Sequence, residues 1–357
     1  MTLILSNDDV GALLTMPECI ATFEDVYKEL SEGRGVTRTR SDTLTPTRHP
    51  EALYSLKTMD GVVPKLGVGA VRINSDIVTW PKQNDTLRRV KVPAAPNGRY
   101  VGLVLLFSCD TGEPLAIFPD GVMQRIRVGA VNGLGVKYLA RENAQSIGIL
   151  GSGWQAGTQL TAAAAVRQIQ TVRCFSTNKS NRQAFAKTMM ETLGFEVVAV
   201  ESPQLAVAGA DIVMCATNSV ESVFFERWLE PGMHITSIKR PEIEAAAIRR
   251  ADRVVVHTQV STPLHTTTRD LLIPEKADGK GWEAAQEIDF ATLPTLPDLI
   301  AGKIPGRTAD AQITCFLNNL GLGYQFAAAG AIVYHKAKEL GLGRELPTDW
   351  FTEDLHP

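Results

Sequence analysis

The chain has 357 residues, 44% of them hydrophobic, and its 36 Lys and Arg against 39 Asp and Glu give a formal net charge of -3. This length predicts two domains, and the charge balance excludes the broad basic surface of a nucleic-acid-binding protein. No apolar run approaches the roughly twenty residues that span a bilayer, and polar residues 6–9 interrupt any signal-peptide core, so we expect a cytoplasmic protein with no membrane partner.

The first 120 residues mix helical and strand-like segments. We predict a helix over residues 17–33 and strands over residues 66–73 and 102–107, the second strand being closed by a turn at residues 110–114. The five cysteines are scattered without CxxC spacing, and the histidines lack the spacing of metal ligands. We therefore expect neither a disulfide framework nor a metal site.

A glycine-rich motif stands at residues 146–157, where an apolar strand runs into GxGxxA and then into an alanine-rich helix. A pyrophosphate needs free backbone N–H groups at a helix N-terminus, and glycines let the backbone approach it. The strand before the motif and the helix after it are the context that a dinucleotide site requires. We assign cofactor contacts to Gly151, Ser152, Gly153, Trp154, Gln155 and Ala156.

Residues 146–257 alternate short β-rich runs with helical stretches, which is typical of a parallel sheet with crossover helices. Apolar spacing predicts one long helix over residues 308–341. We predict an α/β protein in which a Rossmann-type doubly wound domain, residues 130–310, is inserted in an α+β domain of residues 1–129 plus 311–357. Strands are expected over residues 146–150, 172–176, 196–200, 212–215, 234–238 and 253–257, with helices over 154–167, 181–193 and 242–250 and a short one opened by Ser202-Pro203.

The end of the second predicted strand indicates the phosphate state of the cofactor. NAD-preferring folds place Asp or Glu there to hold the ribose hydroxyls, whereas this chain has hydroxyls, an amide and nearby cations. NADP(H) is therefore favoured over NAD(H). The residues assigned to this part of the cofactor are Ser176, Thr177, Asn178 and Arg182, and Ala216, Thr217 and Asn218 at the end of the fourth strand are predicted to line it as well.

The chain resembles the ornithine cyclodeaminase and mu-crystallin family over almost its whole length. Three segments carry the resemblance: residues 111–116 followed by Arg127-Val128-Gly129-Ala130, the glycine-rich motif, and residues 300–308. The resemblance implies a homodimer whose nucleotide domain faces a substrate-binding and dimerisation domain built from both chain ends. It also implies an activity among those of cyclodeaminases, ketimine reductases and amino-acid dehydrogenases.

Arginines are predicted to hold a substrate carboxylate, because a guanidinium binds it through two hydrogen bonds. Arg127 matches the family's carboxylate-binding arginine, and Arg40 best fits the one in the first segment. The family's lysine after a Gly-Val pair is absent, since Gly67-Val68 precedes Gly69. Arg72 or Lys57 is predicted to supply this catalytic cation, although each could equally be a solvated charge.

A second departure follows the predicted strand 234–238. Cyclodeaminases place an acidic residue shortly after this strand, and here that position falls near Pro241. Glu242 could substitute, but after a proline it is predicted to lie in the first turn of a helix, where a carboxylate favours the dipole. Lys239 lies where parallel sheets bind ligands and is assigned to the substrate, with a solvated charge as the alternative.

Together these residues predict an NAD(P)H-dependent reductase of α-imino acids, in which hydride is transferred to C=N while arginines hold the substrate carboxylate. Two alternatives stay open. One is a redox-neutral ornithine-cyclodeaminase-type lyase, which the missing acidic residue disfavours. The other is a non-catalytic protein that binds NADP(H) and a small carboxylate.

Overall fold

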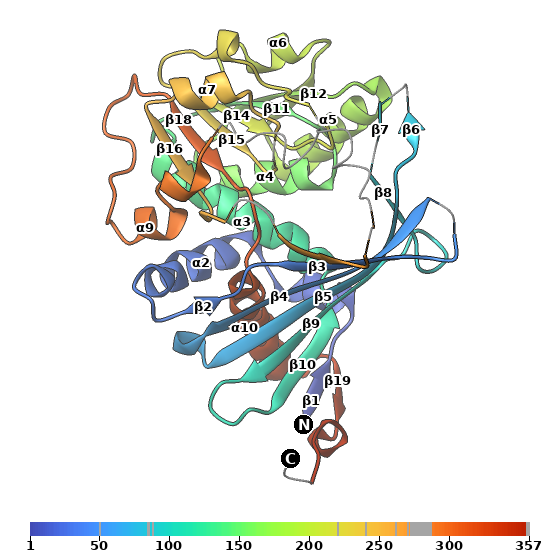
Figure 1. The fold of residues 1–357 in the computed structure, drawn as a ribbon. Coiled ribbons are helices and arrows are strands. Elements are labelled where there is room, and N and C mark those ends of the chain that lie inside the picture. The colour runs from blue at the N-terminus through green and yellow to red at the C-terminus, as the bar shows by residue number, and fades with distance from the viewer. Residues whose placement is uncertain are drawn as a thin grey trace.

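Two β-sheets organise the molecule, one above the other in Figure 1. The computed structural model describes residues 1–357 except 50, 84, 85, 88, 220, 240, 261, 262, 270, 272–287 and 355–357. Both ends of the described chain join the larger sheet, because β1 (Thr2–Ile4) pairs with β10 (Pro114–Pro119) on one side and β19 (Arg344–Leu346) on the other.

Among the described residues the larger sheet has ten strands in the order β17-β3-β4-β5-β9-β10-β1-β19, with β2 beside β4 and β8 beside β5. Its centre is the long antiparallel hairpin of β4 (Ala52–Val63) and β5 (Val68–Thr79), in which buried and half-buried residues alternate. One face therefore meets the core and the other faces outward. The remaining strands are β2 (Val36–Thr37), β3 (Ser41–Pro46), β8 (Val90–Val92), β9 (Val101–Ser108) and β17 (Leu264–Thr267), and a small separate ladder joins β6 (Lys82–Gln83) to β7 (Thr86–Leu87).

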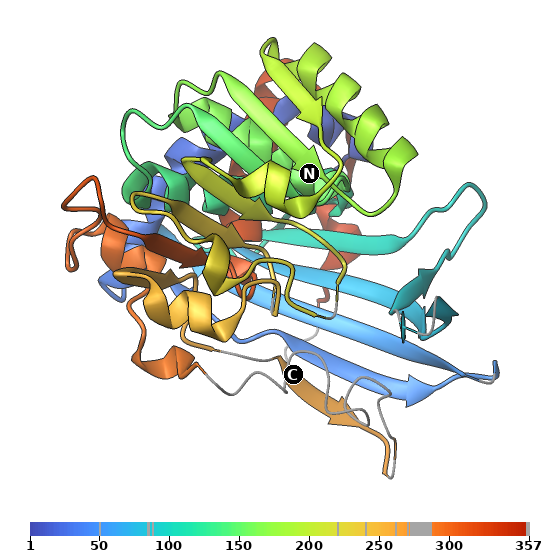
Figure 2. The same ribbon diagram turned by 90° about the horizontal axis from the view of Figure 1, so that it is seen from above.

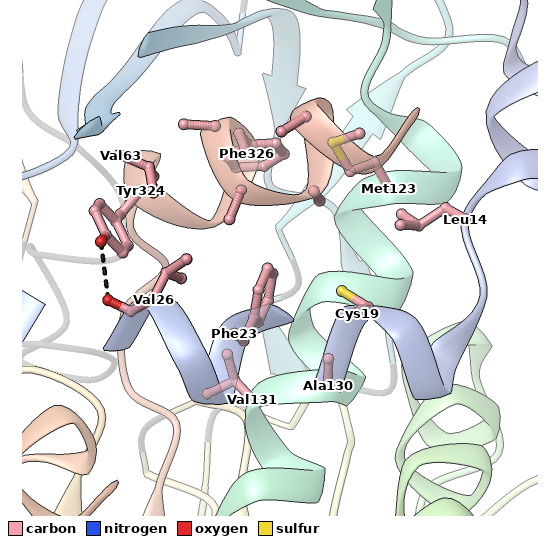
Figure 3. Packing of buried hydrophobic residues seen from close by; sticks show 14 of the residues in the cluster. Leu14, Cys19, Phe23, Val26, Val63, Met123, Ala130, Val131, Tyr324 and Phe326 are labelled. Atoms are coloured by element: carbon pink, nitrogen blue, oxygen red, sulfur yellow. Dashed lines mark hydrogen bonds between the residues drawn. The ribbon is translucent and has the colours of Figure 1, made fainter. Parts of the chain in front are cut away.

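Helices cover the inner face of the larger sheet. The last of them, α10 (Gly323–Leu340), packs along β4, β5 and β9, and α2 (Met16–Ser31) and α3 (Gly121–Leu139) lie between the two sheets in Figure 1. Figure 3 shows Phe326 of α10, Phe23 of α2 and Ala130 of α3 converging in the resulting core. The short helix α1 (Asn7–Leu13) and a 3-10 turn, η1 (Pro64–Leu66), complete this part of the molecule.

The smaller sheet has seven strands in the described part of the chain, all parallel, in the order β13-β12-β11-β14-β15-β18-β16. Strand order reverses direction beside β11, as in doubly wound folds, so the predicted α/β class is confirmed. Figure 2 shows the crossover helices around this sheet. Its elements are β11 (Ser146–Leu150), α4 (Trp154–Val166), β12 (Thr171–Phe175), α5 (Lys179–Leu193), β13 (Glu196–Ala199), α6 (Pro203–Val207), β14 (Ile212–Cys215), η2 (Glu226–Trp228), β15 (His234–Ser237), α7 (Ala245–Arg250), β16 (Arg253–Val256), η3 (Phe290–Thr292), α9 (Leu296–Ile300) and β18 (Thr314–Leu317), and η4 (Thr348–Phe351) follows β19.

The single helix predicted over residues 308–341 is wrong at its start. Residues 314–317 form β18, a fully buried central strand, and α10 begins only at Gly323. A short apolar run buried on both faces has no period that separates strand from helix, so Phe316 appeared to continue the helical pattern.

The predicted domain boundaries stay a prediction. Each sheet contains one strand from the sequence range assigned to the other domain. Strand β18 lies within the predicted substrate domain but pairs in the seven-stranded sheet, and β17 lies within the predicted nucleotide domain but pairs with β3.

The outer face of the larger sheet is apolar and open. Val62, Val101 and Leu103 are 38%, 42% and 39% exposed. In the described part of the chain no helix packs on this face, since α10 contacts the strands from the inner side only, where their residues are buried. Further apolar residues of this face are half-buried: Leu56, Val71, Ile73, Leu105 and Ile117.

Candidate functional site

A cavity of about 940 Å³ opens where the parallel strands β11, β12, β14 and β15 end. This is the point at which the strand order of the sheet reverses, and ligands of doubly wound folds bind there. Most of the residues predicted to hold the cofactor line it. They are Gly151, Ser152, Gly153, Trp154, Gln155, Ser176, Thr177, Asn178, Ala216, Thr217 and Asn218.

The N-terminus of α4 fits a pyrophosphate. Gly153 is its N-cap residue and gives no side-chain hydrogen bond, so the first-turn N–H groups have no partner within the helix. A Cβ on Gly153 would meet no atom within 4 Å, whereas one on Gly151, at φ +121, would lie 2.1 Å from the Ala216 carbonyl oxygen. The tight turn and the open approach expected of these glycines are both present, and phosphate oxygens match the free N–H groups.

Two predicted cofactor residues lie outside the lining of the cavity. Ala156 is fully buried in α4, and its predicted contact with the cofactor stays a prediction. Arg182 is held beside the end of β12: it donates to the Ser176 carbonyl oxygen at 3.2 Å, pairs with Glu201 and lies 5.6 Å from the Phe175 ring centre. Its guanidinium therefore supports the end of β12, and its predicted contact with the cofactor stays a prediction.

Part of the cavity wall is aromatic, which sequence reasoning missed. Phe225 and Trp228 line the cavity with Val223 and Pro203, and the two rings meet edge to face with their centres 5.0 Å apart. They come from the connection between β14 and β15, where no motif marks them. The only available signal was three aromatic residues within five positions in a chain that is 6% aromatic.

Glu242 does not lie in a helix, and that prediction is wrong, because α7 begins only at Ala245. Its carboxylate is completely buried behind the cavity and accepts hydrogen bonds from the Thr217 N–H and hydroxyl, at 2.5 and 2.7 Å, and from the Ile238 N–H at 3.2 Å. Burial raises its pKa. Glu242 thus ties together the ends of β14 and β15.

Charged side chains line the inner face of the larger sheet. Lys57 Nζ lies 2.8 Å from Asp76, and Arg72 donates to Asp120 at 2.7 Å; each of these four groups is at most 9% exposed. Asn74 lies between the two pairs. It is the register partner of Lys57 on the neighbouring strand, and its side chain donates to Asp120 at 3.1 Å. Of the alternatives left open by the sequence, the solvated-charge interpretation of Lys57 and Arg72 is excluded by this burial.

Lys57 differs from an ordinary lysine in its acidity. Burial lowers its pKa to about 8, with the nearby Arg89 charge acting in the same direction and Asp76 opposing it. An ammonium with this pKa exchanges its proton near neutral pH. Arg72, which is also buried and has a lowered pKa, remains a fixed charge.

Arg127 is buried without a carboxylate. Only 4% of it is exposed, and its partners among the described residues are two amide oxygens: Gln325 Oε1, 2.7 Å from Nη1, and Gln124 Oε1, 2.7 Å from Nη2. The Phe326 ring centre lies 5.0 Å from this guanidinium and 5.4 Å from that of Arg72. Burial, with the Arg72 charge second, lowers the pKa of Arg127 to about 9. A bound anion would offset the cost of burying this positive charge.

The other two predicted substrate cations already have partners. Arg40 is 21% exposed and forms a two-point ion pair with Asp42, at 2.6 and 2.7 Å. Lys239 at the end of β15 donates to the Ser219 carbonyl oxygen at 2.5 Å. Their predicted contacts with substrate stay predictions.

A buried tyrosine–histidine pair near Arg127 was also missed. Tyr27 Oη lies 2.7 Å from His257 Nε2, and His257 Nδ1 lies 2.6 Å from the Leu320 carbonyl oxygen. These residues are 230 positions apart in the chain, so no local pattern relates them. Within the described residues no cluster of three metal-ligating side chains occurs, and no helix there is long and apolar enough to cross a bilayer.

Comparison with known proteins gives matches along the whole length. The model of the ornithine cyclodeaminase/mu-crystallin family matches residues 1–341. A Delta(1)-pyrroline-2-carboxylate reductase of Bacillus cereus is 30% identical over 349 residues, which cover 96% of this chain and 99% of the relative. An iminosuccinate reductase of Paracoccus denitrificans is 27% identical over 358 residues, covering 96% and 99%.

A solved structure matches the fold at a TM-score of 0.77. It is that of Thermococcus litoralis Delta(1)-pyrroline-2-carboxylate reductase in complex with NADH and L-proline, 28% identical, and the match covers 97% of this chain and 100% of that one.

Proposed function

The chain belongs to the ornithine cyclodeaminase/mu-crystallin family, and from this we propose that it is an NAD(P)H-dependent reductase of α-imino acids. The observation that carries the proposal is Arg127, a buried guanidinium with two amide partners and no carboxylate among the described residues. The nucleotide cavity at the ends of β11 and β14 supplies the second half of the site. Relatives that reduce Delta(1)-pyrroline-2-carboxylate or iminosuccinate act on substrates of this chemical class.

In the proposed reaction the bound nicotinamide supplies hydride to the carbon of the C=N bond. Arg127 holds the substrate carboxylate, and Arg40 contributes charge from the edge of the site. Lys57 keeps the imine nitrogen protonated, because its pKa of about 8 lets it donate a proton that solvent then replaces. Arg72, fixed by Asp120, adds positive potential without exchanging a proton.

The position of Glu242 favours a reductase over a cyclodeaminase. A lyase of this family needs an acidic side chain after the strand that is β15 here, and the Glu242 oxygens are bound to the backbone and hydroxyl groups of neighbouring strand ends. A carboxylate held in this way supports the sheet and does not reach a substrate amine.

The preferred coenzyme is proposed to be NADP(H). Ser176, Thr177 and Asn178 line the cavity at the end of β12 with hydroxyl and amide groups, so no carboxylate repels a 2′-phosphate at these three positions. A cytoplasmic location is part of the proposal. The five cysteines are free thiols, as expected in a reducing compartment.

We propose a homodimer that buries the outer face of the larger sheet. This face presents Val62, Val101 and Leu103 at 38–42% exposure beside half-buried apolar residues of β5 and β10. An open apolar sheet face of this kind is typical of an interface between subunits. A second copy placed on it covers the same residues on both sides, as two-fold symmetry requires.

The activity is tested by mixing the protein with NADPH and either Delta(1)-pyrroline-2-carboxylate or pyruvate plus methylamine, and following the absorbance of the reduced coenzyme. We expect steady oxidation, and Arg127→Met should raise the KM for the imino acid about 30-fold, since a charge-assisted contact contributes roughly 2 kcal/mol. Arg38→Met, at an exposed arginine paired with Asp60, is the control and should change nothing. Ammonia release from ornithine without net coenzyme oxidation would indicate the lyase, and coenzyme binding without turnover would indicate the carrier.

The role of Lys57 predicts a pH dependence. The cation exists below its pKa of about 8 and is lost above it, so kcat/KM for imine reduction should fall as pH rises through 8. Lys57→Arg keeps its charge at all these pH values and should abolish that part of the fall. Lys91→Arg is the matched control, because Lys91 is the second cation on Asp76, at 2.9 Å, and is 43% exposed. Titration of the substrate is common to all three proteins, so identical profiles for wild type and Lys57→Arg refute the role.

Coenzyme preference is tested at Thr177, an exposed residue of the cavity lining. Thr177→Asp places a carboxylate beside the expected 2′-phosphate and should raise the Kd for NADPH about tenfold while leaving the Kd for NADH within about twofold. In the control Thr177→Asn, the new side chain has nearly the shape of aspartate without its charge. This variant should bind both coenzymes as the wild type does. Wild-type protein that binds NADH more tightly than NADPH in a fluorescence titration contradicts the assignment.

The dimer is tested with two aspartates placed at equally exposed positions. Leu103→Asp, at 39% exposure on the outer face, should convert the protein to monomers in size-exclusion chromatography with light scattering. Val198→Asp, at 40% exposure on β13 of the other sheet, should leave the dimer intact. A wild-type monomer, or dissociation by both variants alike, counts against this interface.

A further inference from the structure

The connection between β18 and α10 lies against the terminal nitrogens of the Arg127 guanidinium. A Cβ on Gly321 would lie 2.2 Å from Nη1 of Arg127, so only glycine allows the backbone to approach this closely. One residue later, the Leu322 N–H donates to Gln325 Oε1 at 2.9 Å, and the same oxygen accepts from Arg127 Nη1 at 2.7 Å. The connection and the guanidinium therefore share one amide oxygen.

His257 contacts the same connection at Leu320, the residue before Gly321. Because a carbonyl oxygen only accepts, the contact of 2.6 Å between His257 Nδ1 and the Leu320 oxygen places the ring proton on Nδ1. Nε2 is then an acceptor, and it receives the Tyr27 hydroxyl at 2.7 Å. Tyr27 and His257 are 0% and 1% exposed, so water does not compete for either bond.

The imidazole is held in this neutral form. Burial lowers the pKa of His257 to about 4, and the positive charge of Arg127 acts in the same direction. Tyr27 comes from α2 and His257 from the end of β16, so the pair also fastens the nucleotide sheet to the helices that cover the substrate sheet.

The hydrogen bonds of Arg127 leave two of its N–H groups for a ligand. A guanidinium has five N–H groups; here Nε–H and one hydrogen of Nη2 point to Gln124, and one hydrogen of Nη1 points to Gln325. One hydrogen remains on each terminal nitrogen. These two N–H groups have no partner among the described residues and are available to the oxygens of a carboxylate.

We propose that His257 and Tyr27 are positioning residues that aim Arg127 at the substrate carboxylate, acting through the Leu320 carbonyl and the Gly321 backbone. The inference rests on the proposed role of Arg127 as the carboxylate anchor. Without the hydrogen bond from His257, the Leu320 carbonyl turns, the Gly321 backbone against the guanidinium shifts, and the two remaining N–H groups of Arg127 are no longer aimed at the bound acid.

Tyr27→Phe and His257→Leu test the proposal, with NADPH and Delta(1)-pyrroline-2-carboxylate as ligands. Each should raise the KM for the imino acid about tenfold, with kcat and the Kd for NADPH within about twofold of wild type. Because both residues act through one chain of hydrogen bonds, the double variant should be no worse than the more affected single variant.

Tyr324→Phe is the matched control. Its hydroxyl donates to the carbonyl oxygen of Val26, on the same helix as Tyr27, at 2.9 Å (Figure 3). Its ring centre lies 6.3 Å from that of Tyr27. Like Tyr27→Phe, this variant removes one buried hydroxyl hydrogen bond, but it should keep the wild-type KM for the imino acid. His257→Asn should recover most of the loss seen in His257→Leu, because its amide N–H replaces Nδ1–H as donor to Leu320.

The outcomes separate this proposal from the one on which it rests. If Arg127→Met raises the KM while folded Tyr27→Phe and His257→Leu do not, the positioning role is wrong and the carboxylate anchor stands. If Arg127→Met leaves the KM unchanged, the anchor itself is wrong. Equal losses in Tyr27→Phe and Tyr324→Phe, or loss of NADPH binding together with imino-acid binding, indicate general destabilisation and overturn the inference. Tyr27→Phe alone decides the matter if His257→Leu fails to fold.

Discussion

The burial of one uncompensated positive charge shapes the site. A guanidinium removed from water costs several kcal/mol unless hydrogen bonds and an opposite charge offset the loss. At Arg127 the two glutamine oxygens and the Phe326 ring supply the neutral part of this compensation, and the structure leaves the ionic part to a ligand. The free protein therefore already holds a buried positive charge that an acidic ligand can pair with.

Two further cations are buried on the inner face of the larger sheet, and each has a carboxylate partner. Lys57 and Arg72 are each paired with a buried aspartate, and the positive charge of Arg72 still lowers the pKa of Arg127. Asn74 lies opposite Lys57 on the neighbouring strand and donates to Asp120, so it stands between the two pairs on the inner face of the sheet. Breaking either pair would leave a second buried charge, so the network and the fold of β4 and β5 stabilise each other.

Sequence reasoning predicted what short-range rules control. The GxGxxA motif, the strand before it and the carboxyl-end loops place most of the predicted cofactor residues at one cavity, because glycine geometry and parallel topology are local or general constraints. It failed where distant segments decide. Phe316 belongs to a strand because β15 and β16 flank it, Glu242 is buried by two strand ends, and Tyr27 meets His257 only after both sheets have formed.

The position of β18 constrains how the protein is made. This strand follows β16 in the chain by more than fifty residues, yet it pairs between β15 and β16. While the ribosome is still translating the segment before residue 314, β16 has no strand partner in this sheet and the centre of the nucleotide-binding unit is incomplete. This sheet can therefore be completed only after residues 314–317 have been synthesised, and a polypeptide released before then would expose the unpaired edge of β15.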